Sequence, residues 1–173
     1  PTPTECDRLA GYSHTPRVAG APGVAEIADA PAAVAACEVA VAAEGADLFL
    51  NFLLARAIEQ VDPMDGRIVT LLTAGAEAYP VFGAGRLALM HDYGLGGSAI
   101  DPARVLALNE ISCAAAPDPQ ALAACNNLAI ILSGGESPDM ARAEALPAMA
   151  GWLIDARLAP SVRRATADAL GVM

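Results

Sequence analysis

Leucine–alanine pairs at residues 54–55, 87–88 and 128–129 mark three similar stretches of the chain. The pairs are 33 and 41 residues apart, and each lies in a stretch whose small and apolar residues follow helical spacing. The central copy, residues 75–101, predicts the end of one helix, a tight turn, a second helix and a glycine-rich exit loop. Repeats of this length with two helices per unit are typical of a helical solenoid.

The composition favours an all-α fold. Hydrophobic residues make up 55% of the 173 residues but aromatic residues only 4%, and alanine supplies the difference. Alanine is the best helix former, and small side chains require helices that pack closely. No long alternation of β-branched residues predicts a sheet. We therefore expect an α-α superhelical solenoid of about three to four helical hairpins.

The chain divides into an arm and a helical region. Residues 1–28 contain four prolines and three glycines without helical periodicity, so we expect an irregular N-terminal arm over the surface, with a short turn near Cys6. Residues 29–173 form the expected repeat domain, in which Asp29 and Asp101 cap helices that have proline in the first turn. The expected helices cover about 30–45, 46–60, 63–78, 80–93, 102–113, 119–133 and 138 onward, with Pro147 dividing the last of these, and a capping helix at about 160–170.

The charge of the chain argues against two classes of partner. Twenty acidic and ten basic side chains give a formal net charge of −10, and no basic cluster exists beyond Arg163 and Arg164. Such a chain is a poor nucleic-acid binder, and we interpret the charge as favouring solubility. No segment has the roughly 18–20 continuous apolar residues of a transmembrane helix, so we expect no membrane insertion. Because the chain begins at Pro1, we expect a mature product whose signal peptide has been removed.

The four cysteines predict either two disulfides or four buried thiols. No CxxC motif and no neighbouring histidine is present, so we expect no metal site. Cys113 and Cys125 flank a proline-containing turn between two expected helices, where a disulfide could join them. Cys6 and Cys37 would then pair by elimination and tie the arm to the first helix. Such disulfides persist in oxidising compartments, whereas free cysteines behave as small buried hydrophobes.

Two stretches could carry chemistry, and for each a structural interpretation is favoured. Residues 94–98 could cradle a phosphate, but a phosphate loop follows a strand and opens a helix, whereas this one follows a helix. His91 with Asp92 and a cysteine could form a nucleophile pair, but nothing places a cysteine beside it. At a helix end, a histidine instead interacts favourably with the helix dipole. No calcium-loop pattern is present, and we expect no cofactor.

The repeat units carry a recurrent set of short motifs. Ala76-Glu77-Ala78, Leu87-Ala88 and Gly94-Leu95-Gly96 occur in this order before Asp101. This order resembles the Sel1-like repeat family, a branch of the tetratricopeptide-like α-solenoids, over about residues 30–145. Alanine replaces the family's glycine after each leucine, and Tyr79 stands where the family usually has glycine, so the repeats are divergent. The stretch 125–129 looks like the cysteine-bearing repeats of secreted members, in which a disulfide joins the two helices of a unit.

The resemblance implies a non-catalytic scaffold that binds another protein or peptide in the bacterial periplasm or outside the cell. In this family the first helix of each hairpin tends to line a concave face. Polar residues on those helices thereby become candidate contacts: Glu38, Arg67, Thr70, Arg104 and Glu110.

Two other functions stay open at this point. Some cysteine-rich relatives have been associated with penicillin binding, so the alternative is a cell-wall-ligand or β-lactam binding protein, or a hydrolase, that uses the same groove. The sequence offers no Ser-x-x-Lys set for it. A third possibility is a structural subunit whose concave face is filled by its own arm or by a second copy, and the oligomeric state stays open.

Overall fold

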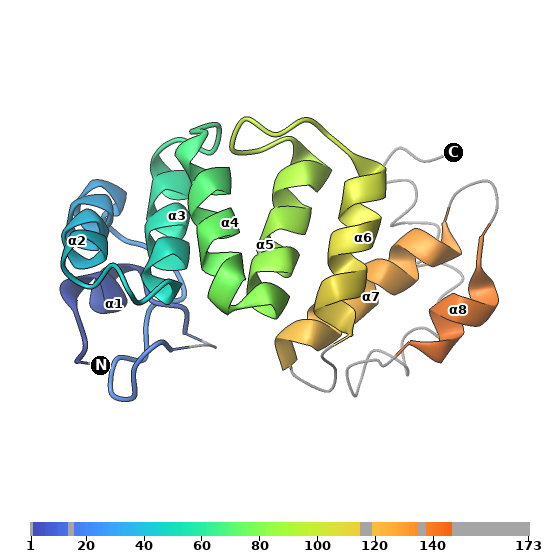
Figure 1. Cartoon of the computed structure of the whole chain (residues 1–173), viewed down its shortest axis with the longest axis horizontal. Coiled ribbons are helices and arrows are strands. Elements are labelled where there is room, and N and C mark those ends of the chain that lie inside the picture. Colours follow the sequence, from blue (N-terminus) through green and yellow to red (C-terminus); the bar gives the residue numbers. More distant parts are fainter. Residues whose placement is uncertain (1, 14–15, 115–118, 135–137, 147–173) are drawn as a thin grey trace.

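The described part of the chain is helical. A computed structural model describes residues 2–13, 16–114, 119–134 and 138–146. Within these ranges there is no strand, only an isolated bridge between Tyr12 and Val24. The helices, drawn in Figure 1, are α1 Glu5–Ala10, α2 Ala30–Ala43, α3 Phe49–Val61, α4 Arg67–Ala78, α5 Pro80–Tyr93, α6 Pro102–Cys113, α7 Pro119–Ser133 and α8 Met140–Ala145.

Helices that follow one another in the sequence lie side by side, so that α2 to α6 form a row (Figure 1). Two pairs of helices that are not consecutive in the sequence also pack together, α1 with α3 and α5 with α7. The all-α prediction is therefore confirmed for the described residues, and the order of helices along the row follows the sequence.

Aspartate side chains decide where several helices begin. Asp29 and Asp101 cap α2 and α6 as predicted, each accepting a backbone hydrogen bond at 3.0 Å. Helices α3 and α4 begin three to four residues later than predicted, because aspartates in the preceding turns bind N–H groups two residues ahead. Asp47 and Asp65 therefore hold turns where the sequence suggested helix, and Asp62 holds a turn at the predicted break between two helices.

The C-terminal helices are shorter than expected. Helix α8 begins at Met140, where Asp139 caps it, and it ends at Ala145. Pro147 and the expected capping helix at about 160–170 lie outside the described residues.

The main core is built around α3. Nine of its thirteen residues are buried, and apolar side chains from α1, α2, α4, α5 and α6 pack around them. The ring of Phe52 lies so close to Gly75 of α4 that a Cβ there would meet it at 2.6 Å. Likewise, a Cβ on Gly83 of α5 would lie 2.3 Å from the Cβ of Ala76. Small residues thus set the helix separations, as the alanine-rich composition suggested.

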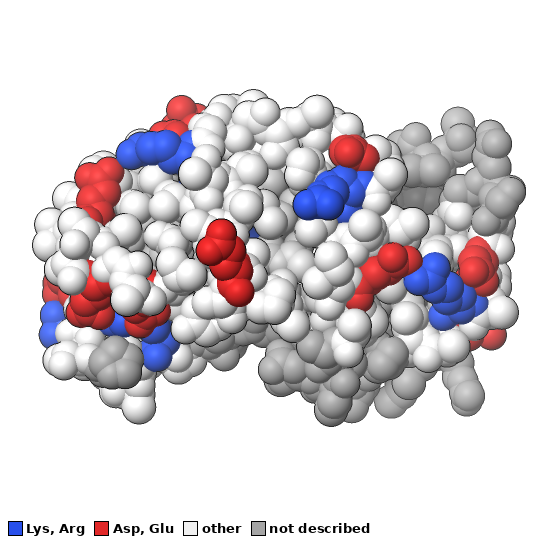
Figure 2. Space-filling model, in the orientation of Figure 1, with Lys and Arg blue, Asp and Glu red and all other residues white. Residues whose placement is uncertain are grey.

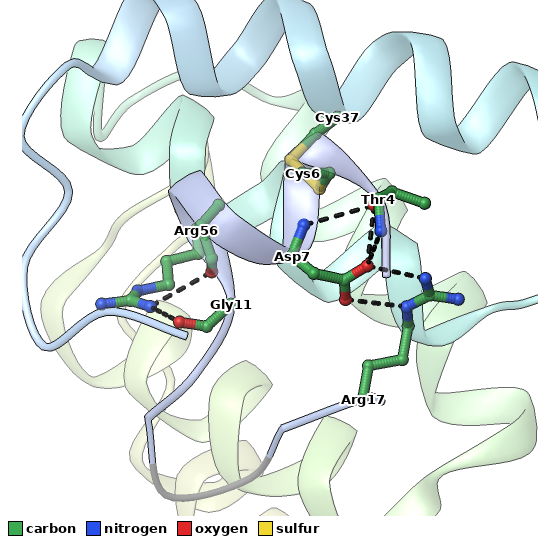
Figure 3. The surroundings of a disulfide bond; sticks show 8 residues. Thr4, Cys6, Asp7, Gly11, Arg17, Cys37 and Arg56 are labelled. Carbon is green, nitrogen blue, oxygen red and sulfur yellow. Dashed lines mark hydrogen bonds and ion pairs between the residues drawn. A yellow bond between two sulfur atoms is a disulfide. The ribbon is translucent and has the colours of Figure 1, made fainter. Parts of the chain in front are cut away.

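The first helix of the arm packs into the core, where the sequence predicted only a short turn, whereas the described residues after it, 11–13 and 16–28, form no helix, as predicted. Residues 5–10 form α1, which begins with a capping box in which Thr4 and Asp7 exchange hydrogen bonds. Cys6 and Ala10 are fully buried in the main core. A disulfide joins Cys6 to Cys37 and so attaches α1 to α2 (Figure 3). A six-residue helix is too short to show apolar periodicity, so the sequence indicated only a short turn at this place.

Arg17 fastens the arm from one side. The Arg17 side chain is only 3% exposed, and its guanidinium donates to both oxygens of Asp7 at 2.9 and 2.7 Å (Figure 3). It also donates to Asp47 at 2.6 Å and to Glu44 at 3.2 Å, in the turn between α2 and α3. The bonds to Asp7 raise the pKa of Arg17. Burial raises the pKa of Asp7, but hydrogen bonds from Arg17 and Thr4 outweigh it, and the pKa lies below its ordinary value.

Arg56 of α3 fastens the arm from the other side. One terminal nitrogen donates to the carbonyls of Ala10 and Gly11 at 3.1 and 2.7 Å (Figure 3). The other donates to the carbonyls of residues 24 and 25 at 3.0 and 2.8 Å. The guanidinium also lies 4.9 Å from the ring centre of Tyr12. One side chain therefore holds both ends of the arm's long loop.

Replacing Arg56 by methionine should weaken the whole fold. Arg56→Met keeps an apolar stem but leaves four carbonyl groups without their charged donor, so we expect the free energy of unfolding to fall by about 2–4 kcal/mol. Urea denaturation of the oxidised protein measures this loss of stability. Arg8→Met is the control, because Arg8 forms only an exposed pair with Glu5 and should cost less than about 1 kcal/mol. Equal urea midpoints for the two variants would contradict the role of Arg56.

The Asp7–Arg17 pair should make stability sensitive to acid. Because the folded pKa of Asp7 lies below its unfolded value of about 3.9, its stabilisation is complete above that value and is lost as the pH falls through the folded pKa. In urea titrations from neutral to strongly acidic pH, we expect Asp7→Asn to lose less stability than the natural chain. The exposed Asp92→Asn serves as the control. Parallel curves for all three proteins would refute the prediction.

Candidate functional site

The five predicted contact residues lie on three alternate helices. Glu38 lies on α2, Arg67 and Thr70 lie on α4, and Arg104 and Glu110 lie on α6. Four of them are exposed, and Glu110 is partly buried. The even-numbered helices therefore carry the candidate site.

The structure brings Glu38 and Arg67 together. Arg67 donates to Glu38 at 3.2 Å, to Oδ1 of Asp65 at 3.2 Å and to Oδ2 of Asp65 at 3.0 and 2.8 Å. The hydrogen bonds between Asp65 and Arg67 raise the pKa of the arginine and lower that of the aspartate, so both are charged at neutral pH. Thr70 lies one turn along α4, and its hydroxyl contacts the carbonyl of Gly66 at 3.5 Å. The result is an exposed charged contact between α2 and α4.

Arg104 and Glu110 do not join this group. The backbone N–H of Arg104 is capped by Asp101, and Glu110 accepts a hydrogen bond from Arg142 of α8 at 2.5 Å. Among the described residues, no hydrogen bond or ion pair links either of them to Glu38 or Arg67. The candidate residues therefore form two separate ion-paired bridges between helices, α2 to α4 and α6 to α8.

Sequence reasoning missed the partners Asp65 and Arg142. Asp65 lies two residues before the start of α4, and an aspartate at that position followed by glycine is a recognisable turn signal. Arg142 gave no signal, because its partner lies 32 residues earlier in the chain.

The glycine-rich stretch after α5 is an exit loop. Gly94 ends α5 with φ of 67° in the left-handed region, as a helix C-cap glycine does. The N–H groups of Leu95, Gly96 and Ser98 donate to the carbonyls of residues 90, 63 and 95. Since these donors are taken by the chain itself, the loop has no row of free N–H groups with which to hold a phosphate.

The histidine and the cysteines do not form a catalytic pair. The Nδ1 atom of His91 lies 3.3 Å from the carbonyl oxygen of Ala99, near the end of α5. Cys6 pairs with Cys37 and Cys113 pairs with Cys125, the two pairings expected from the sequence, so no cysteine is left as a thiol nucleophile. In the described ranges, no group of three or more candidate ligands could hold a metal ion. Nor is any helix there long and apolar enough to cross a membrane.

Comparisons of the chain with protein-family models, with curated proteins and with solved structures find no match. The interpretation of the candidate site therefore rests on its own geometry.

Two glycines of the exit loop should respond differently to substitution. Both Gly96 and Gly97 have positive φ, but a Cβ on Gly96 would lie 2.9 Å from Val69 Cγ2, whereas one on Gly97 would lie 3.9 Å from its nearest neighbour. We expect Gly97→Ala to cost about 1 kcal/mol of stability from backbone conformation alone, and Gly96→Ala about 2–4 kcal/mol because overlap is added. Thermal unfolding measures the difference. Equal losses would show that the loop does not pack tightly on α4.

Proposed function

We propose that the chain is a divergent Sel1-like repeat protein that acts as a non-catalytic scaffold for another protein or peptide. The observation that carries this proposal is that charged contacts join alternate helices, Glu38 of α2 to Arg67 of α4 and Glu110 of α6 to Arg142 of α8. Among the odd-numbered helices, α1 packs against α3 and α5 packs against α7. Contacts between alternate helices are expected where helical hairpins stack on one another.

Stacked hairpins offer a way to bind an extended partner. The row of first helices makes a continuous surface that can accept a helix or an extended segment. Here that row is α2, α4 and α6, so the proposed contacts are Glu38, Arg67, Thr70, Arg104 and Glu110.

A partner can replace the exposed ion pairs of this face with ion pairs of its own. Exposed ion pairs contribute about 0–1 kcal/mol in water, so a partner that offers its own charged groups displaces them at little cost. Asp65 accepts hydrogen bonds from Nε and Nη2 of Arg67, and these bonds orient the planar guanidinium before a partner carboxylate arrives. The face is thus prepared for polar recognition without a catalytic group.

The disulfides support action outside the cytoplasm. Disulfides persist in oxidising compartments such as the periplasm or the extracellular medium. Cys6–Cys37 attaches the arm and Cys113–Cys125 joins α6 to α7, so each fastens neighbouring helices of the fold. We therefore propose that the scaffold is exported.

The alternative, a β-lactam or cell-wall-ligand binder or hydrolase, would use the same face. The chain contains no lysine, so a Ser-x-x-Lys set is impossible. Incubation with a fluorescent penicillin, followed by denaturing electrophoresis, tests it: covalent labelling would replace the scaffold proposal by this alternative.

Removal of three charges from the proposed face should abolish binding. Peptides are selected from a random library on the immobilised, oxidised protein, and their affinities are measured by calorimetry. We expect the combined Arg67→Ala, Arg104→Ala and Glu110→Ala variant to lose at least about tenfold in affinity, since each lost charged contact contributes about 1 kcal/mol or more.

The matched control changes three exposed polar residues elsewhere: Arg8→Ala, Glu26→Ala and Gln60→Ala. It should bind as the natural chain does. Unchanged affinity in the first variant would show that α2, α4 and α6 do not form the binding face. Gel filtration of the natural chain separates a monomeric scaffold from a subunit whose face is filled by a second copy.

A further inference from the structure

Four large apolar side chains are exposed together at one end of the helix row. They lie at the ends of α3 and α5 and in the two loops that follow, residues 62–66 and 94–101, which both lie at the top of Figure 1. We call this surface the loop edge. Its members are Val61, Met64, Tyr93 and Ile100, and between 55% and 67% of each is exposed.

The two loops of the loop edge hold each other in place. Gly96 donates its N–H to the carbonyl of Pro63 at 2.8 Å, and its backbone packs against Val69. Two further bonds close the second loop on α5, one between Asp101 N–H and the His91 carbonyl at 3.1 Å and one between the His91 ring and residue 99. The apolar side chains are therefore presented by a fixed backbone, which reduces the entropy lost when a partner binds.

The surroundings of the loop edge are acidic. Four aspartates stand in or beside the two loops: Asp62, Asp65, Asp92 and Asp101. Two arginines, Arg67 and Arg104, lie in the first turns of the following helices, and Arg67 already forms ion pairs with Asp65 and Glu38. Figure 2 shows an uncharged surface over the loop that joins α5 to α6, with charged side chains at either end of it.

We propose that the loop edge binds a cationic amphipathic segment of another protein. Apolar side chains of that segment would cover Met64, Tyr93 and Ile100, and its lysines or arginines would face the aspartates. The exposed ring of Tyr93 also offers its face to a cation. A second copy of this chain fits less well, because its own aspartates and a net charge of −10 would be brought against the same rim.

This surface is distinct from the face of α2, α4 and α6, so the inference goes beyond the proposed function. The four apolar side chains come from α3, α5 and the loops, and none of them is among the five residues proposed for that face.

The test uses a synthetic 14-residue amphipathic peptide of leucine and lysine, titrated by calorimetry at low and moderate salt. We expect saturable binding that weakens with salt, because the charged part of the interaction is screened. The combined Met64→Ser, Tyr93→Ser and Ile100→Ser variant should lose at least about tenfold in affinity, since much apolar contact area is removed. The Asp62→Asn and Asp92→Asn variant should bind about three- to tenfold more weakly and with a smaller salt effect.

Two controls locate the site. Val39→Ser with Ile111→Ser removes apolar side chains that are exposed on α2 and α6, and it should leave the affinity unchanged. The variant with alanine at Arg67, Arg104 and Glu110 should bind at least as tightly as the natural chain, which separates this surface from the proposed scaffold face.

Several results would overturn the inference. The first is the absence of saturable binding up to about 1 mM peptide. The second is that a peptide in which glutamate replaces lysine binds the natural chain as tightly as the lysine peptide does. The third is that the serine variant of the loop edge binds the lysine peptide as tightly as the natural chain does. If the natural chain sediments as a dimer and the serine variant sediments as a monomer, a second copy of the chain occupies the loop edge instead.

Discussion

Close approach of neighbouring helices is the constraint on which the rest of the structure depends. Gly75 leaves room for the ring of Phe52, and Gly83 lets α5 come within contact of Ala76. Because these contacts involve small side chains, the helices lie near one another and can be joined by short turns, such as Tyr79 between α4 and α5. A larger residue at either glycine would push the row apart and separate the two loops that meet at the loop edge.

Polar contacts that hold the arm add to the apolar packing of the main core. Arg56 and Arg17 together bind the arm through carbonyl and carboxylate oxygens that lie in α1, the long loop and the α2–α3 turn. Each guanidinium is satisfied by several oxygens at once, which is the condition under which a buried charge stabilises a fold. The Cys6–Cys37 disulfide acts on the same segment by restricting the unfolded chain.

The sequence predicted the regular parts of this fold and missed the parts that depend on distant contacts. Helical periodicity and the caps Asp29 and Asp101 located α2 and α6, since the information lies within one turn of the helix. The burial of the arm could not be predicted, because Arg56 reaches carbonyls up to 46 residues away. The same limit hid the loop edge, which exists only because Gly96 meets Pro63, and it hid the bridge from Glu110 to Arg142.

The two proposed surfaces differ in what a partner must displace, and this difference determines how each would respond to salt. On α4, a partner must replace the ion pair that Arg67 makes with Glu38, so its contacts there are charged and are weakened by salt. At the loop edge, a partner displaces only water from the exposed side chains of Tyr93 and Ile100. The burial of these side chains contributes binding free energy that persists when salt screens the aspartates. High salt would therefore release a partner from the helix face before one from the loop edge.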